Sequence, residues 1–416
     1  MEQGIHPDVR VFKKNPLSLV YIAGFFFSAH VALTTYINSS FLLEKNITEN
    51  QVGLVFTMSS ILALLLISFV PGFIEKIGKE TSFFLTSLIV ILSLLGMLFL
   101  SSLFSVISLF VLYTALINVT FLLFDVSIEE YTPQESMGSV RGLFLMVNNI
   151  AWVIAPLITG YIVDITFGFT WVYILGGILS LLAMLTMMAL PTQKPFRMRI
   201  KERMDSITSF FSFSFLRHEV ITLQESFQYI RKEKTLSKIL FTHWLLRFFE
   251  VWMIIYAPIY LSQHIGFSWQ SIGLIFTIML LPFVLFQFPL GFLADKKHIE
   301  RKGIITGFYI VGISTIGMIF IQNPIVWLWA GILFFTRIGS SAIEVLTDTL
   351  FFKKISATDI TSMSIYRNAR PVAFIVAPVA GSIILSLGIS FKFLFLILGI
   401  LMLFGGYFAQ KIPRII

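Results

Sequence analysis

The sequence contains no cysteine, which excludes disulfide bonds, thiolate metal sites and cysteine nucleophiles. It is also poor in charge, since only 12% of its 416 residues are Asp, Glu, Lys or Arg, roughly half the share that is usual in soluble domains. So few charges cannot cover a surface that faces water on all sides. The length alone suggests two or three soluble domains, and the composition excludes them.

Apolar side chains are present in excess along the whole chain. Hydrophobic residues make up 57% of the sequence, and the mean hydropathy is +0.89. A helix of about 20 mostly apolar residues crosses the hydrocarbon core of a bilayer. Twelve such spans are predicted, at 17–43, 52–74, 82–101, 104–125, 140–163, 169–190, 238–262, 271–294, 304–321, 325–352, 363–387 and 391–410. The predicted fold class is an all-α polytopic membrane protein of twelve transmembrane helices.

The distribution of basic residues predicts the orientation in the membrane. Lys and Arg are retained in cytoplasmic loops, and 24 of the 30 basic residues lie on the side that the two termini share. Only Lys45 and Lys392 lie on the other side, and the remaining four are arginines inside helices. We therefore expect a multi-pass protein of the plasma or inner membrane with both termini in the cytoplasm. The net charge of +8 follows from this bias, so it gives no reason to expect nucleic acid as a partner.

Three parts are predicted along the chain. Residues 1–190 form an N-terminal six-helix bundle, 191–237 a cytoplasmic linker, and 238–416 a C-terminal six-helix bundle. The linker begins with basic residues and continues with an aromatic patch, a composition typical of segments that lie on the lipid surface of the inner leaflet. The alternative is a binding site for a partner protein.

The two predicted bundles share an internal repeat. Short matching segments recur at offsets of 220 to 222 residues. The matched pairs are Gly53 and Gly273, Thr57 and Thr277, Glu75 and Asp295, and Pro156 and Pro378. Because these matches fall in nearly one register, they indicate a duplication of six helices, an arrangement that places a substrate site near the midplane between the halves.

A short motif follows the second span of each predicted half. The two copies read Gly291-Phe292-Leu293-Ala294-Asp295-Lys296 and, more loosely, Pro71-Gly72-Phe73-Ile74-Glu75-Lys76. The copy that begins at Gly291, in the second half, is similar to the Gly-x-Leu-Ala-Asp-Arg signature of the major facilitator superfamily. Together with the helix count, the linker and the repeat, it makes the chain resemble that superfamily over nearly its whole length. The resemblance implies a carrier of small solutes, and we expect a monomer without cofactor or metal.

Charges near the cytoplasmic helix ends predict a gate. A carboxylate at a helix end can pair with a cation or a helix N-terminus of the other half, so Glu75 and Asp295 are predicted to latch the cytoplasmic side. The alternative for these two is a tight turn among basic residues, and for the other charges a position at the membrane interface. The predicted gate residues are Glu75, Asp295, Asp125, Asp348, Arg367 and Arg370.

Charged residues also lie deep inside two predicted helices. A charge at the bilayer centre costs about 2.5 to 3.5 kcal/mol, so such residues are expected to face a cavity or a partner. At helical spacing they form one polar stripe on each helix. The stripes consist of His243, Arg247 and Glu250 on one helix, and of Arg337, Ser341, Glu344 and Asp348 on the other.

These stripes predict the chemistry of the central cavity. Glu250 is the first candidate for a group that exchanges protons, and Glu344 is the second. The alternative is a structural network with permanent ion pairs between Arg247 and Glu250 and between Arg337 and Glu344. The N-terminal half offers neutral hydrogen-bonding groups, with His30 either contacting substrate or satisfied in the interior. The predicted cavity residues are Glu250, Arg247, Arg337, Glu344, His30, Asn118, Asn148 and Asn149.

The favoured interpretation is a secondary active transporter that moves a small solute by alternating access and couples to protons. A uniporter of the same fold is the nearest alternative, and a non-transporting receptor or a lipid-handling protein comes from a different class. An enzyme is not expected, since the sequence has no P-loop, His-Glu-x-x-His or Gly-x-Ser-x-Gly motif. The arginines favour an anionic or polyhydroxyl solute, whereas the many aromatic residues favour an apolar one.

Overall fold

The computed structural model describes residues 16–132, 137–190, 234–297, 299–354 and 360–413. Most of the predicted linker lies outside these residues. Inside the helices, the side chains of Glu75, Asp295 and Arg367, which are predicted for the cytoplasmic gate, also lie outside the description.

The described part of the chain is helical, and twelve of its helices are long and apolar enough to cross a membrane. The N-terminal half contains α1 (Pro16–Thr35), α2 (Asn38–Glu44), α3 (Glu49–Ile77), α4 (Lys79–Phe99), α5 (Leu103–Tyr131), α6 (Met137–Thr166) and α7 (Thr170–Met188). The C-terminal half contains α10 (Lys234–Ile259), the π-helix η2 (Tyr260–His264), α11 (Trp269–Lys297), α12 (Glu300–Gly317), the 3₁₀ turn η3 (Met318–Phe320), α13 (Val326–Lys354), α14 (Ile360–Ser386) and α15 (Lys392–Ala409). The predicted fold class and number of spans are confirmed.

Two boundaries differ from the prediction. The predicted span at 17–43 is divided into α1 and the short α2. Near the break, the hydroxyl of Thr35 donates to the carbonyl of Val31 at 2.6 Å, and Ile37 N donates three residues back to Thr34 at 3.1 Å. The first is a side-chain bond of the kind that bends helices, and the second is a three-residue turn that replaces the regular four-residue spacing. The second difference is that α10 begins at Lys234, inside the predicted linker 191–237.

Local sequence signals explain how α3 begins and ends. Thr48 and Gln51 form a capping box at its N-terminus. The helix ends at Gly78, whose φ of 78° lies in the left-handed region that glycine adopts without a steric cost. Lys79 then begins α4 at once, so the connection between the two helices is a single residue.

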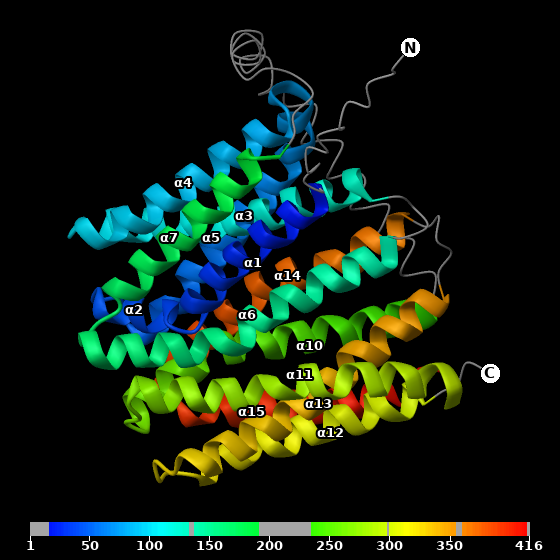
Figure 1. The fold of residues 1–416 in the computed structure, drawn as a ribbon. Helices are drawn as coiled ribbons and strands as arrows, with labels where there is room; N and C mark the ends of the chain where they lie inside the picture. Colours follow the sequence, from blue (N-terminus) through cyan, green and yellow to red (C-terminus); the bar gives the residue numbers. More distant parts are fainter. Residues whose placement is uncertain (1–15, 133–136, 191–233, 298, 355–359, 414–416) are drawn as a thin grey trace, which may run out of the picture.

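The helices form two bundles that lie one above the other (Figure 1). The seam between them is made by α3 against α14 and by α6 against α11. Large apolar side chains such as Phe99, Phe104 and Leu387 are exposed on the outside of the bundles. A surface of this kind suits contact with lipid, because the hydrocarbon chains of lipids offer polar groups no hydrogen-bond partners.

Residues matched by the repeat meet at this seam. A Cβ atom on Gly53 would lie 2.3 Å from the carbonyl oxygen of Pro378, and one on Gly273 would lie 2.3 Å from that of Pro156. Only glycine therefore permits these helix crossings. The matched threonines act in the same way, since Thr57 donates to the carbonyl of Ile375 at 3.1 Å and Thr277 to that of Val153 at 3.0 Å. The repeat thus has a structural basis in two reciprocal contacts.

Further polar contacts join the halves at the end of the bundle where α3 and α11 begin, here named the closed end. Asp164 of α6 accepts hydrogen bonds from the backbone N–H groups of Trp269 and Gln270, both at 2.9 Å. It thereby caps the N-terminus of α11 with a negative charge. His264 Nε2 lies 2.9 Å from a carboxylate oxygen of Glu49. A hollow of about 1260 Å³ lies over these contacts and is lined by both halves.

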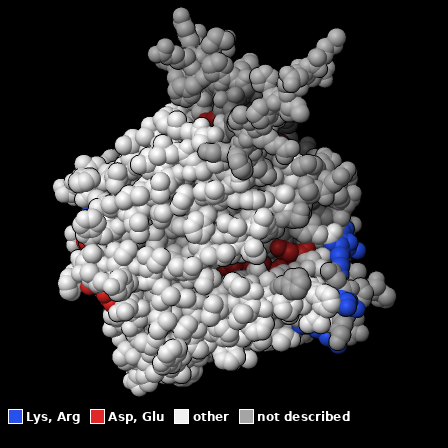
Figure 2. All heavy atoms as spheres, viewed as in Figure 1, with Lys and Arg blue, Asp and Glu red and all other residues white. Residues whose placement is uncertain are grey.

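A cleft separates the halves toward the opposite end, here named the open end. In Figure 2, acidic side chains lie recessed between the upper, N-terminal half and the lower, C-terminal half. The cleft runs toward the end of the molecule where Lys and Arg gather. The structure is therefore closed at one end of the seam and open toward the other.

Candidate functional site

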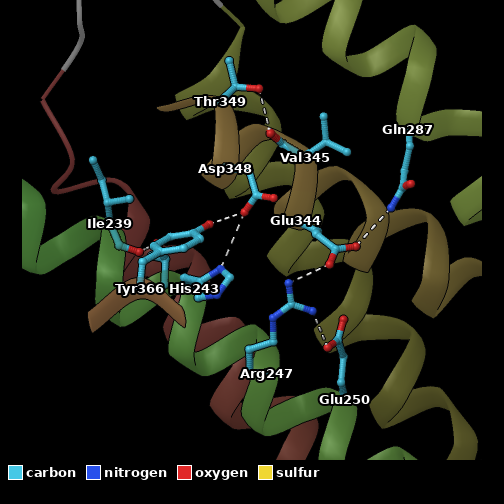
Figure 3. Close-up of polar contacts among 11 residues, drawn as sticks. Ile239, His243, Arg247, Glu250, Gln287, Glu344, Val345, Asp348, Thr349 and Tyr366 are labelled. Carbon is cyan, nitrogen blue, oxygen red and sulfur yellow. Dashed lines mark hydrogen bonds and ion pairs between the residues drawn. The ribbon is translucent and has the colours of Figure 1, made fainter. Parts of the chain in front are cut away.

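Arg247 holds two carboxylates at once. Its Nη1 donates to Glu250 Oε2 at 2.7 Å, one turn along α10, and its Nη2 donates to Glu344 Oε1 of α13 at 2.6 Å (Figure 3). The three side chains are between 15% and 21% exposed. We name these residues the triad. With both carboxylates ionised, its net charge is −1.

The two carboxylates of the triad are held differently. Glu344 accepts a further hydrogen bond at its second oxygen, from Gln287 Nε2 of α11 at 3.1 Å (Figure 3). The second oxygen of Glu250 accepts none from the described residues. Glu250 is therefore the carboxylate with fewer partners to lose on protonation. Gln287 was not predicted, although its isolated amide in an apolar span is a signal that the sequence carries.

Asp348 lies one turn along α13 from Glu344 and belongs to a second cluster. The hydroxyl of Tyr366 donates to its Oδ1, and His243 Nδ1 lies 3.9 Å from the same oxygen. The rings of His243 and Tyr366 are stacked with centroids 3.8 Å apart, as Figure 3 shows. Asp348 was predicted for the gate, and the structure places it beside the triad within the C-terminal half. Tyr366 was missed, because no periodic pattern marks it.

Arg337 does not pair with Glu344, whose oxygens are taken by Arg247 and Gln287. Its side chain is nearly fully buried, with the residue 3% exposed. The guanidinium carbon lies 5.8 Å and 5.9 Å from the ring centres of Phe249 and Phe283. Its Nε is buried without a hydrogen-bond partner.

Arg370 of α14 is exposed, and it lies within electrostatic range of Arg247, Glu250 and Glu344. Since these residues belong to the interior, Arg370 faces the cleft and not the lipid. Its guanidinium carbon lies 5.8 Å from the ring centre of Phe374. We predicted Arg370 for the gate, and in the structure its charge also acts on the triad.

The N-terminal half contributes a buried polar network around His30. Its Nε2 lies 2.8 Å from the hydroxyl of Tyr113, which in turn lies 2.9 Å from Thr34 Oγ1. His30 is fully buried and packs edge to face on Phe27. Its Nδ1 is buried without a hydrogen-bond partner among the described residues, so His30 is satisfied at only one of its two ring nitrogens.

The remaining predicted residues of this half differ in their surroundings. Asn118 is exposed and donates to the carbonyl of Thr114 at 3.0 Å. Asn149 is exposed, whereas Asn148 is 7% exposed with its Oδ1 unpartnered. Asp125 is partly buried. Among the described residues, no group of three or more His, Cys, Asp or Glu side chains is arranged to hold a metal ion.

Comparisons with known proteins agree on one architecture. The family model of the Major Facilitator Superfamily matches residues 17–268 and 239–414. Two crystal structures of the nucleoside transporter NupG, one of them of a mutant, resemble this structure with TM-scores of 0.72 and 0.73 at 13% sequence identity. They cover 96% of this chain, which in turn covers 99% and 100% of theirs. No curated protein matches the sequence.

Proposed function

Because the chain belongs to the major facilitator superfamily, we propose that it is a secondary active transporter which moves a small solute by alternating access and couples to protons. The family and the structural neighbours indicate a transporter and not an enzyme. The proposal adds proton coupling and alternating access, which a shared fold does not specify.

The triad is the observation that carries proton coupling. Protonation of Glu250 removes its attraction for Arg247, yet Arg247 keeps its ion pair with Glu344 at 2.6 Å. A lone guanidinium in the interior is costly, and the second carboxylate avoids this cost. Glu250 can therefore gain and lose a proton while the cation beside it stays paired. A permanent structural pair has no need of this second partner.

Alternating access is supported by the asymmetry of the seam. The closed end is held by glycine crossings and by Asp164 at the N-terminus of α11, whereas a cleft with acidic side chains opens between the halves toward the open end. In our proposal the open end faces the cytoplasm together with both termini, because basic residues gather there. The carrier acts as a monomer, with the basic linker 191–237 on anionic lipid.

Flux into proteoliposomes tests the proposal. Uptake of labelled solutes is compared with and without an inward pH gradient, using a panel of small anions, sugars and amines together with uridine, because NupG is a nucleoside transporter. We expect one class to accumulate only with the gradient. Equilibration without accumulation identifies a uniporter, and the lack of any flux in folded protein favours a receptor or a lipid-handling protein. Glu130→Gln, which alters an exposed carboxylate paired with Lys79, is the matched control and should keep coupling.

A further inference from the structure

Arg337 is a buried cation without an acceptor. The residue is 3% exposed, its Nε is unpartnered, and within the described part of the chain it forms neither a hydrogen bond nor an ion pair. Burying an unpaired guanidinium is among the costliest arrangements in a membrane protein. Arg247 shows that this fold can supply carboxylates where a cation needs them. The vacant donors of Arg337 therefore indicate an acceptor that the chain does not provide.

The aromatic neighbours of Arg337 do not fill this need. Phe249 and Phe283 lie within 6 Å of the guanidinium carbon and offer cation–π attraction. Their rings accept no charge-assisted hydrogen bond of the kind that carboxylates and phosphates accept from a guanidinium. The rings shield the cation from lipid and leave its N–H groups for an oxygen ligand.

Tyr36 brings a donor from the N-terminal half to the same place. It lies just after α1, is 6% exposed, and packs on Phe276 with ring centres 4.8 Å apart. Both Arg337 and Arg370 lie within electrostatic range of its hydroxyl. That hydroxyl makes no hydrogen bond with the described residues. Two cations of one half thus act electrostatically on a hydroxyl donor of the other half.

The charges in this region favour a ligand that enters together with a proton. The guanidinium groups of Arg337 and Arg370 carry two positive charges, the triad has a net charge of −1, and the carboxylate of Asp348 beside the triad adds another negative charge. The region is therefore neutral without ligand. Joint entry of a monoanion and a proton leaves the charge of the site unchanged, which suits coupling between the two.

We propose that Arg337, Arg370 and Tyr36 form an anion-binding subsite and that the transported solute is a small organic anion with a carboxylate or phosphate group. The inference rests on the transport function proposed above and names its substrate class. Because Tyr36 belongs to one half and the arginines to the other, a bound anion links the halves and is released when they separate.

Thermal unfolding of the purified full chain, followed by tryptophan fluorescence, tests the subsite by binding alone. The anionic probes are acetate, benzoate and phenyl phosphate, and the matched uncharged or cationic probes are acetamide, benzamide, uridine and benzylamine. We expect at least one anion to raise the unfolding temperature in a saturable way, and the matched probes to have no effect. Preference for benzoate or for phenyl phosphate distinguishes a carboxylate from a phosphate ligand.

Two variants locate the effect. Arg337→Met and Arg370→Gln should each weaken the affinity for the anion about 10- to 100-fold, the usual contribution of a hydrogen bond to a charged group. Lys296→Gln, which removes an exposed basic residue packed on Phe292, should leave the affinity unchanged. Without ligand, Arg337→Met should unfold at the wild-type temperature or above it, because it removes an unpaired buried charge.

Four results overturn the proposal. The first is that benzamide or uridine stabilises the protein as much as the anions do, and the second is that no anion stabilises it. The third is that both arginine variants still bind the anion with unchanged affinity, and the fourth is that ligand-free Arg337→Met unfolds at a lower temperature than the wild type. Because the readout is binding, it does not depend on proton coupling. Failure of the transport proposal appears instead in the proteoliposome flux.

Discussion

Arg247 lies between two carboxylates, so removing one carboxylate should lower the free energy of unfolding less than removing the guanidinium does. Glu250→Gln leaves Arg247 paired with Glu344 at 2.6 Å and keeps an amide oxygen near Nη1. We expect it to lower the free energy of unfolding by about 1 kcal/mol, the scale of one hydrogen bond. Arg247→Met leaves two carboxylates without their cation. We expect it to cost about 3 to 5 kcal/mol, the usual range for breaking a buried pair.

The assay is unfolding of purified protein followed by tryptophan fluorescence at pH 7. Glu130→Gln is the control, because the pair of Glu130 with Lys79 involves a carboxylate that is 53% exposed, and such pairs contribute about 0 to 1 kcal/mol. Adding Glu250→Gln and Glu344→Gln to Arg247→Met should restore much of the lost stability, because no uncompensated charge then remains. Equal losses in Glu250→Gln and Arg247→Met, or no recovery in the triple variant, refute the bridging role of Arg247.

Three further predictions concern topology and the ends of the seam. In this cysteine-free chain, a single cysteine introduced at Asn46 should react with an impermeant reagent only from outside, and one introduced at Ile200 only from the cytoplasm. Reversed labelling contradicts the predicted orientation. Asp164→Asn removes the charge that caps α11, so spin-label distances across the closed end should lengthen, and unchanged distances exclude a role in closure. Asp295→Asn should slow turnover of the folded carrier by removing a cytoplasmic latch, and unchanged transport with unchanged distances across the open end removes that role.

The fold was largely predictable because the bilayer imposes it. Each span must be about 20 apolar residues long, so counting spans recovers the helices even where Thr35 and Ile37 divide the first. The repeat also predicted which positions are special. Gly53 and Gly273 recur in the sequence because each meets a proline carbonyl of the other half, although the sequence alone did not reveal those partners.

The site was predictable only in part. Helical spacing correctly placed Arg247, Glu250 and Glu344 on two polar stripes, but it could not say which cation meets which carboxylate. Pairing depends on the relative height of α10 and α13, which periodicity does not contain. The alternative of a structural network paired Arg337 with Glu344, whereas in the structure Arg247 occupies that place. Tyr366 comes from a third helix, and sequence spacing carries no information on such a contact.

The proton-exchange role of Glu250 is the central claim, and uphill uptake by Glu250→Gln proteoliposomes tests it most directly. The variant imitates the protonated carboxyl group permanently while Arg247 stays paired with Glu344. Our account predicts that a pH gradient no longer drives accumulation of the solute, whereas exchange of internal for external solute continues. A folded Glu250→Gln protein that still accumulates solute against its gradient would contradict the account.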